Sequence, residues 1–455
     1  MAGKKLLPEY GFAPPNPVSG GKKQSLPEGL RKDLDTLRSF CPASERLNAA
    51  TAFAESAKSG TDISEAFPYL SDALQDPEEG IRSKAASAIC LGLAKTTNPN
   101  YPELVFPLAS AVTDPNPETR CSVVQSLGRL ARKGNNHALA MIAIISKLND
   151  TVPKVRVCAC RAVREAGSRA DVDLLPAMPG LTACISDSNP RVRAEAVNGI
   201  GKAALKGVDI SGAIPKLISA LTDPEAQVRG VAADALKEAG NVSVALIQGF
   251  MPDIIAALKD KKLVRGAREK CIRLVGTADA KGVDISDAIP FLVEGVTDAD
   301  ASVRLASASA LADAARNQAH RKPIVLRMAE LIASESPEDR SIGLRVIEGM
   351  ASQNIDVSEA SEAIPAVIAI LPEDDQERLN TAIKILNSCF KSNFDGTREK
   401  ITKGISEYIG TASFAREAER NSPVYVRTIE IFAKVMKAIQ DAKRKHEKAN
   451  NKGGG

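Results

Sequence analysis

The chain has 455 residues and a formal net charge of +4, and 44% of its residues are hydrophobic while 4% are aromatic and none is tryptophan. That length would fit three ordinary globular domains, but their cores would have to be built from aliphatic and small side chains. No apolar run approaches the length that spans a bilayer, and the first residues lack the apolar centre of a signal peptide. We therefore expect a soluble, cytoplasmic protein.

Residues 1–32 are rich in proline, glycine and lysine and show no helical periodicity. Prolines stiffen such a segment and glycines loosen it, so we predict an extended basic arm with a hinge. Its aromatic residues, Tyr10 and Phe12, are candidates for docking on a partner, and a disordered terminus is the alternative interpretation. We expect a helical region with degenerate capping units over 33–436, and a basic helix end and tail over 437–455.

A helix pair is predicted most clearly between Gly282 and Asn317. Asp284 and Asp287 are suited to capping a helix start, and Pro290 is tolerated in the first turn. Apolar residues at helical spacing then define a first helix, and a second stripe follows the turn residues 297–300. The first stripe is Ile289, Leu292, Val293 and Val296, and the second is Val303, Ala306, Ala310, Leu311 and Ala314. One pair cannot bury both stripes alone, so we expect it to stack against further copies.

An aspartate followed six residues later by an arginine marks the copies, and successive arginines lie 36 to 39 residues apart from Arg46 to Arg378. A sustained period of this length predicts a helical solenoid. One residue is missing from the spacing between Asp260 and Arg265, and Ser334 replaces the aspartate in a later copy. Helix ends are expected at glycines that can adopt the left-handed C-cap conformation, namely Gly60, Gly134, Gly207 and Gly282.

Several copies open the first helix with an apolar residue and proline, as in Ile289-Pro290, and start the second with Val-Arg, as in Val303-Arg304. Together with the turn aspartate, these residues resemble HEAT repeats, over roughly nine-tenths of the chain. The resemblance implies an all-α, right-handed α-solenoid of about ten to eleven helix pairs. It also implies that the aspartates and arginines form a structural ladder between neighbouring pairs. The ladder residues are Asp76, Arg82, Asp114, Arg120, Asp150, Arg156, Asp187, Arg193, Asp223, Arg229, Asp260, Arg265, Asp298 and Arg304.

Charge is distributed unevenly along the chain. The terminal regions 1–32 and 437–455 each carry six basic residues against two acidic ones, so the body between them is acidic overall. Within the body, 129–169 holds nine basic residues against two acidic ones, 259–281 is a second basic stretch, and 330–377 holds twelve acidic residues against two basic ones. Basic residues outside the ladder are candidate partner contacts, namely Arg161, Arg164, Arg169, Lys261 and Lys262.

Residues suited to catalysis or metal binding are scarce. The eight cysteines lack C-x-x-C spacing, which favours buried core thiols over metal ligands or disulfides. The three histidines, His137, His320 and His446, lie far apart in the sequence, and there is no phosphate-binding loop or dinucleotide motif. We therefore predict no enzyme activity, no cofactor and no metal site.

Three functions are compatible with these observations. The preferred one is a non-catalytic scaffold or adaptor that binds one or more proteins, or a macromolecular complex, through the concave surface of the helices. The second is binding of nucleic acid or a ribonucleoprotein by the basic middle repeats and tails; with few aromatic residues for base stacking, it would be directed at the backbone and sensitive to salt. The third is an enzyme-associated role like that of the HEAT-like bilin lyases or DNA-glycosylase-like proteins, which would rest on fold alone.

Overall fold

The computed structural model describes residues 26–38, 41–95, 101–134, 136–258, 265–332, 334, 336–352 and the single positions 433, 437 and 444. These residues form 19 α-helices and five short 3-10 helices, with no strand among them. None of these helices combines the length and the apolar character that crossing a membrane requires. The chain divides into two compact units, residues 1–126 and 127–455. The predicted all-α class is confirmed.

The first unit is built from consecutive helix pairs, in which α3 packs on α4 and α4 packs on α2 of the preceding pair. Helix α1 begins before the expected boundary at residue 33, because Leu26 and Leu30 are buried and belong to the core. The helices of this unit are α1 (Glu28–Arg38), α2 (Ala43–Ser59), α3 (Phe67–Ala73), α4 (Glu79–Lys95), α5 (Val105–Ala111) and the start of α6 (Pro117–Arg132).

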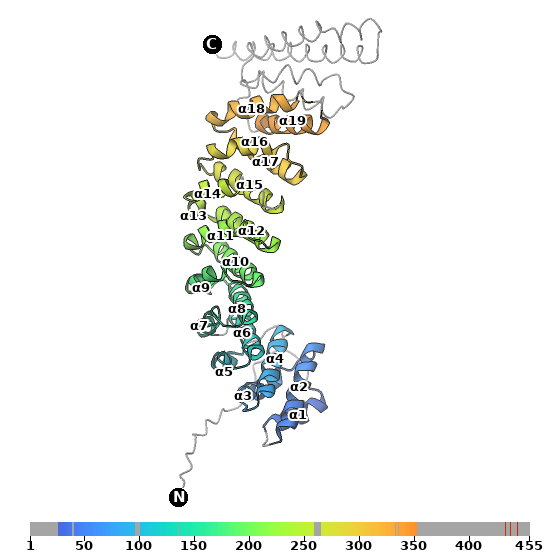
Figure 1. Cartoon of the computed structure of the whole chain (residues 1–455). Helices are drawn as coiled ribbons and strands as arrows, with labels where there is room; N and C mark the ends of the chain where they lie inside the picture. The colour runs from blue at the N-terminus through green and yellow to red at the C-terminus, as the bar shows by residue number, and fades with distance from the viewer. Residues whose placement is uncertain are drawn as a thin grey trace, which may run out of the picture. The chain divides into compact units, whose positions relative to one another are not determined.

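The second unit repeats the same plan. A short first helix is followed by a longer second helix, and successive second helices contact one another from α8 to α10, α12, α15, α17 and α19. In Figure 1, the first helices α9, α11 and α14 lie on one side of the second unit, and the second helices α10, α12 and α15 lie on the other. The helices are α7 (His137–Ser146), α8 (Pro153–Ala166), α9 (Met178–Cys184), α10 (Pro190–Leu205), α11 (Ile214–Ala220), α12 (Ala226–Val242), α13 (Ala245–Gln248), α14 (Met251–Leu258), α15 (Arg265–Ala280), α16 (Ile289–Gly295), α17 (Ala301–Ala314), α18 (Gln318–Ile332) and α19 (Pro337–Ser352).

The apolar stripes of the predicted pair form the core between α16 and α17. Leu292, Val296, Val303 and Leu311 are all fully buried, whereas Val293 is half-buried. A 3-10 turn, Ser286–Ala288, precedes α16, so the helical backbone starts three residues before Ile289. The periodicity therefore predicts the buried face of both helices.

Small residues bring successive second helices close together. A Cβ atom added at Gly276 of α15 would lie 3.1 Å from the Cβ of Ala310 in α17, and one at Gly201 of α10 would lie 3.4 Å from that of Ala235 in α12. Each predicted glycine lies one or two residues after the last residue of a helix. All four have positive φ, at 99° for Gly60, 92° for Gly134, 73° for Gly207 and 87° for Gly282. The predicted glycine C-caps are confirmed, and they set where each next pair begins.

Candidate interaction site

The loop before each second helix is organised by its aspartate. Oδ1 of Asp187 accepts the backbone N–H of Asn189 at 2.8 Å, and Oδ1 of Asp223 accepts that of Glu225 at 2.8 Å. A carboxylate in this position satisfies an N–H group that would otherwise lack a partner at the loop. The same bond recurs at Asp76, Asp114, Asp150 and Asp298.

The ladder arginine is the fourth residue of each second helix that follows these loops. Nη1 of Arg193 donates to the carbonyl oxygens of Asp187 at 2.9 Å and Ser188 at 3.3 Å, which fixes the loop of its own pair. The equivalent bonds are made by Arg82, Arg120, Arg156, Arg229 and Arg304.

The rest of the guanidinium joins neighbouring pairs. Nε and Nη2 of Arg156 donate to the two carboxylate oxygens of Asp187 at 2.6 and 2.8 Å, and those of Arg193 donate to Asp223, both at 2.7 Å. In the first unit, Arg46 pairs with Asp76 at 2.9 Å and Arg82 pairs with Asp114 at 2.5 Å. We call each aspartate–arginine ion pair between neighbouring helix pairs a rung.

The rungs are shielded from water. The side chains of Arg156 and Asp187 are 15% and 9% exposed. Burial by itself would raise the pKa of Asp187, but hydrogen bonds from Arg156 and from the Asn189 N–H, with the charges of Arg156 and Arg193, hold that pKa below its ordinary value. The Asp223 carboxyl has a lowered pKa for the same reasons. The carboxylates are therefore charged in the folded protein near neutral pH.

One predicted ladder residue is wrong. The rung to Asp298 is made by Arg268 at 2.9 Å, whereas the residue spacing predicts Arg265 for this pair. The reason is helix position, because Arg265 is the first residue of α15 and Arg268 is the fourth. Its expected loop partner, Asp260, lies outside the described residues, as do Lys261, Lys262, Tyr10 and Phe12.

The ladder changes between α17 and α19, where Ser334 occupies the aspartate position. Ser334 Oγ still accepts the N–H of Ser336 at 3.2 Å, and its carbonyl still accepts Nη1 of Arg340 at 2.9 Å. Serine has no second oxygen for the arginine of the preceding pair. Arg304 instead faces Glu338 at 3.5 Å, and the Glu338 side chain is 76% exposed. Serine thus preserves the loop and omits the rung.

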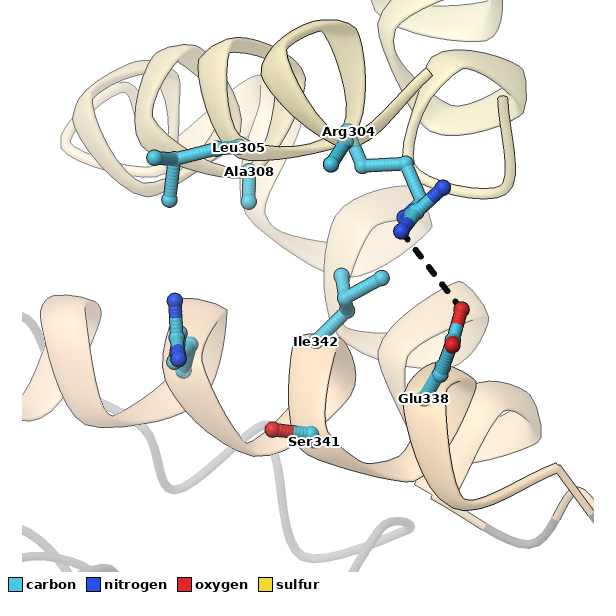
Figure 2. A pocket seen from close by; sticks show the side chains of 8 residues that line it. Arg304, Leu305, Ala308, Glu338, Ser341 and Ile342 are labelled. Atoms are coloured by element: carbon cyan, nitrogen blue, oxygen red, sulfur yellow. Dashed lines mark ion pairs between the residues drawn. The ribbon is translucent and has the colours of Figure 1, made fainter. Parts of the chain in front are cut away.

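A groove of about 460 Å³ lies beside this position, between α17 and α19. Figure 2 shows Leu305 and Ala308 of α17 directed toward α19, Ile342 directed back toward α17, and the Arg304–Glu338 ion pair at one end. Leu305 is 49% exposed although it is a large apolar residue. The groove residues are Ala301, Arg304, Leu305, Ala308, Glu338, Ser341, Ile342 and Arg345. This surface is not among the sites predicted from the sequence, where its one signal is the serine at 334.

The candidate arginines of the basic middle have acidic neighbours. Arg161 donates to Glu195 at 2.7 Å, and Arg164 lies 3.6 Å from the other oxygen of that carboxylate. Arg169 pairs with Asp171 at 2.5 Å. A track for phosphates needs arginines free of acidic partners, so the arrangement of these three side chains weakens the nucleic-acid hypothesis.

The buried cysteines pack in the core, and one buried histidine links neighbouring helix pairs. Cys90, Cys160, Cys184 and Cys271 are buried thiols, as predicted for the core, whereas Cys41 is only half-buried. The prediction is wrong for Cys121 and Cys158, which are buried but disulfide-bonded. His320 is buried with its Nε2 2.9 Å from Ser286 Oγ in the preceding pair. Among the described residues, no group of three or more His, Cys, Asp or Glu side chains is placed to hold a metal ion.

These features define the class of the protein as an α-solenoid, in which helix pairs stack in chain order. Comparison with protein families then identifies the repeats, because the family described as HEAT repeats matches residues 142–237 and 178–273. The α-solenoid therefore contains HEAT repeats over residues 142–273, as the sequence resemblance implied.

Among solved structures, the chain is similar to the crystal structure of an engineered protein from the Northeast Structural Genomics Consortium. The TM-score is 0.53 and the identity 19%, over 79% of this chain and 98% of the other. At that identity the likeness shows the fold alone. No curated protein matches the sequence.

Proposed function

We propose that this protein is a non-catalytic scaffold or adaptor that binds other proteins through the face formed by its second helices. HEAT repeats form extended stacks, and in curved solenoids the long concave surface serves for binding. The observation that carries the proposal is the groove between α17 and α19, where Leu305 stays half-exposed instead of joining the core. Large exposed apolar side chains that line a groove are typical of interaction sites.

Affinity purification of the tagged full chain from its own cells tests this proposal, with and without nuclease and at two salt concentrations. We expect a protein partner that survives nuclease and is lost with Leu305→Glu. The matched control is Leu175→Glu, since Leu175 is similarly exposed, at 55%, and belongs to the 3-10 turn before α9, outside the groove. Recovery of RNA or DNA that dissociates at high salt would instead support the nucleic-acid hypothesis.

A further inference from the structure

We propose that the groove between α17 and α19 binds an acidic segment of a partner protein. A carboxylate of that segment pairs with Arg304 in place of the missing ladder aspartate, and a neighbouring aliphatic side chain packs on Leu305 and Ile342. The inference rests on the proposed scaffold function and names the chemistry of the partner at one site.

Arg304 has a weaker acidic partner than the arginines that form rungs. Its Nη1 donates to the carbonyl oxygens of Asp298 at 2.9 Å and Ala299 at 3.1 Å. Among the described residues, the partner of its Nη2 is Glu338 at 3.5 Å. Glu338 is mostly exposed, so water competes for its carboxylate and the ion pair contributes little. A partner carboxylate can replace Glu338 and supply the bidentate geometry that a guanidinium prefers.

The rest of the groove suits an aliphatic side chain. Leu305, Ala308 and Ile342 supply its apolar surface, and the volume of about 460 Å³ falls in the range of sites that enclose small ligands. It therefore fits a few side chains of an extended or helical segment. Covering the exposed part of Leu305 would remove apolar surface from water, which favours binding.

The charges of the groove favour an acidic occupant over a basic one. Among the described residues, its lining holds two arginines, Arg304 and Arg345, and one carboxylate, that of Glu338. Arg345 is exposed and has no ion pair with another residue in the described part of the chain. Phosphates would also meet these arginines, but the described lining between them is apolar and offers no aromatic ring for a base. A peptide with acidic and aliphatic residues matches both parts of the surface.

Peptide selection tests the inference directly. Random twelve-residue peptides displayed on phage would be selected on the immobilised full chain, and enriched peptides would be synthesised with a fluorescent label. Fluorescence anisotropy then gives the Kd for the wild type and for variants with opposite expected effects. Ser334→Asp supplies the missing carboxylate to Arg304, Glu338→Gln removes the competing one, Leu305→Glu blocks the apolar surface, and Leu175→Glu is the matched control.

We expect the enriched peptides to combine Asp or Glu with Leu, Ile or Val. Their Kd should rise at least about tenfold with Ser334→Asp and with Leu305→Glu, fall with Glu338→Gln, and stay unchanged with Leu175→Glu. Enrichment of no peptide, of basic peptides, or of peptides that bind Ser334→Asp as well as the wild type would overturn the inference. If the peptide selection fails in this way but affinity purification recovers a nuclease-resistant protein partner, the scaffold function stands and only the acidic-segment inference is wrong. If affinity purification recovers nucleic acid alone, both the scaffold function and the inference are wrong.

Discussion

Replacing Asp187 by serine tests how much one rung stabilises the stack. The substitution copies the residue found at 334, so serine can still accept the N–H of Asn189 while Arg156 loses both carboxylate bonds. Hydrogen bonds to charged groups contribute about 1.5–3 kcal/mol each, and breaking a fully buried ion pair costs about 3–5 kcal/mol. Arg156 keeps its bonds to the Asp150 and Thr151 carbonyls and some access to water, so we expect a loss of about 2–3 kcal/mol.

Urea unfolding followed by circular dichroism gives the free energy change, and hydrogen exchange in α8 and α10 locates it. Both are needed because long repeat arrays can unfold in parts. Asp209→Ser is the matched control, since Asp209 accepts the Ser211 N–H at 2.9 Å, is exposed, and pairs with no arginine among the described residues. A loss below about 0.5 kcal/mol for Asp187→Ser, with unchanged exchange, would refute a stabilising role for the rungs.

Three further predictions concern the ladder and the stack. Ser334→Asp should raise the melting temperature by adding a rung worth about 1 kcal/mol, and an unchanged value would mean that Glu338 already satisfies Arg304. The pKa of Asp187 in the folded protein is lower than that of an ordinary aspartate, so the stabilisation by its rung is complete above the ordinary aspartate pKa and is lost as the pH falls through the lowered pKa. The difference in stability between the wild type and Asp187→Ser should therefore shrink in acid. Gly276→Val should lower the melting temperature, since even a Cβ there lies 3.1 Å from Ala310, whereas unaltered melting would show that α15 and α17 can separate.

The sequence predicts the fold well because the repeat reports the same physical constraints many times. Apolar periodicity predicts the buried stripes, and glycine marks the helix ends through its tolerance of positive φ. Residue spacing does not predict the pairing of Arg268, because a rung depends on the position of the arginine within its helix, while the spacing also counts the loop residues before that helix.

The candidate site is less accessible to sequence reasoning. Glu195 lies 34 residues beyond Arg161, and only the stacked geometry brings the two together. Arg161→Glu would place a second carboxylate beside that of Glu195, which is only 12% exposed, and their repulsion would disturb the structure. Arg161→Gln removes the positive charge without adding a negative one, so it is the better variant for testing phosphate binding. The serine at 334 is visible in the sequence, but its consequence for Arg304 requires the distances.

A polar side chain can bridge two second helices outside the ladder, as the junction between α12 and α15 shows. Among the described residues, the buried Nε of Arg229 has no hydrogen-bond partner. Lys270 crosses from α15 and donates to Asp234 at 2.6 Å and to the Gly230 carbonyl at 3.4 Å. The position equivalent to Lys270, two residues after the ladder arginine, is Ile342 in α19, which has no polar group to make such a bridge.

The groove therefore needs two departures from the repeat. Ser334 removes the carboxylate that would hold Arg304, and Ile342 with Leu305 replaces a polar bridge by apolar surface. Farther along the same helices, a Cβ at Gly349 would lie 3.2 Å from that of Ala312, so α17 and α19 remain in close contact there. Since stability in a solenoid is shared among many neighbouring interfaces, one weakened junction can be tolerated. That tolerance is compatible with the binding surface proposed between α17 and α19, because the stack stays folded around it.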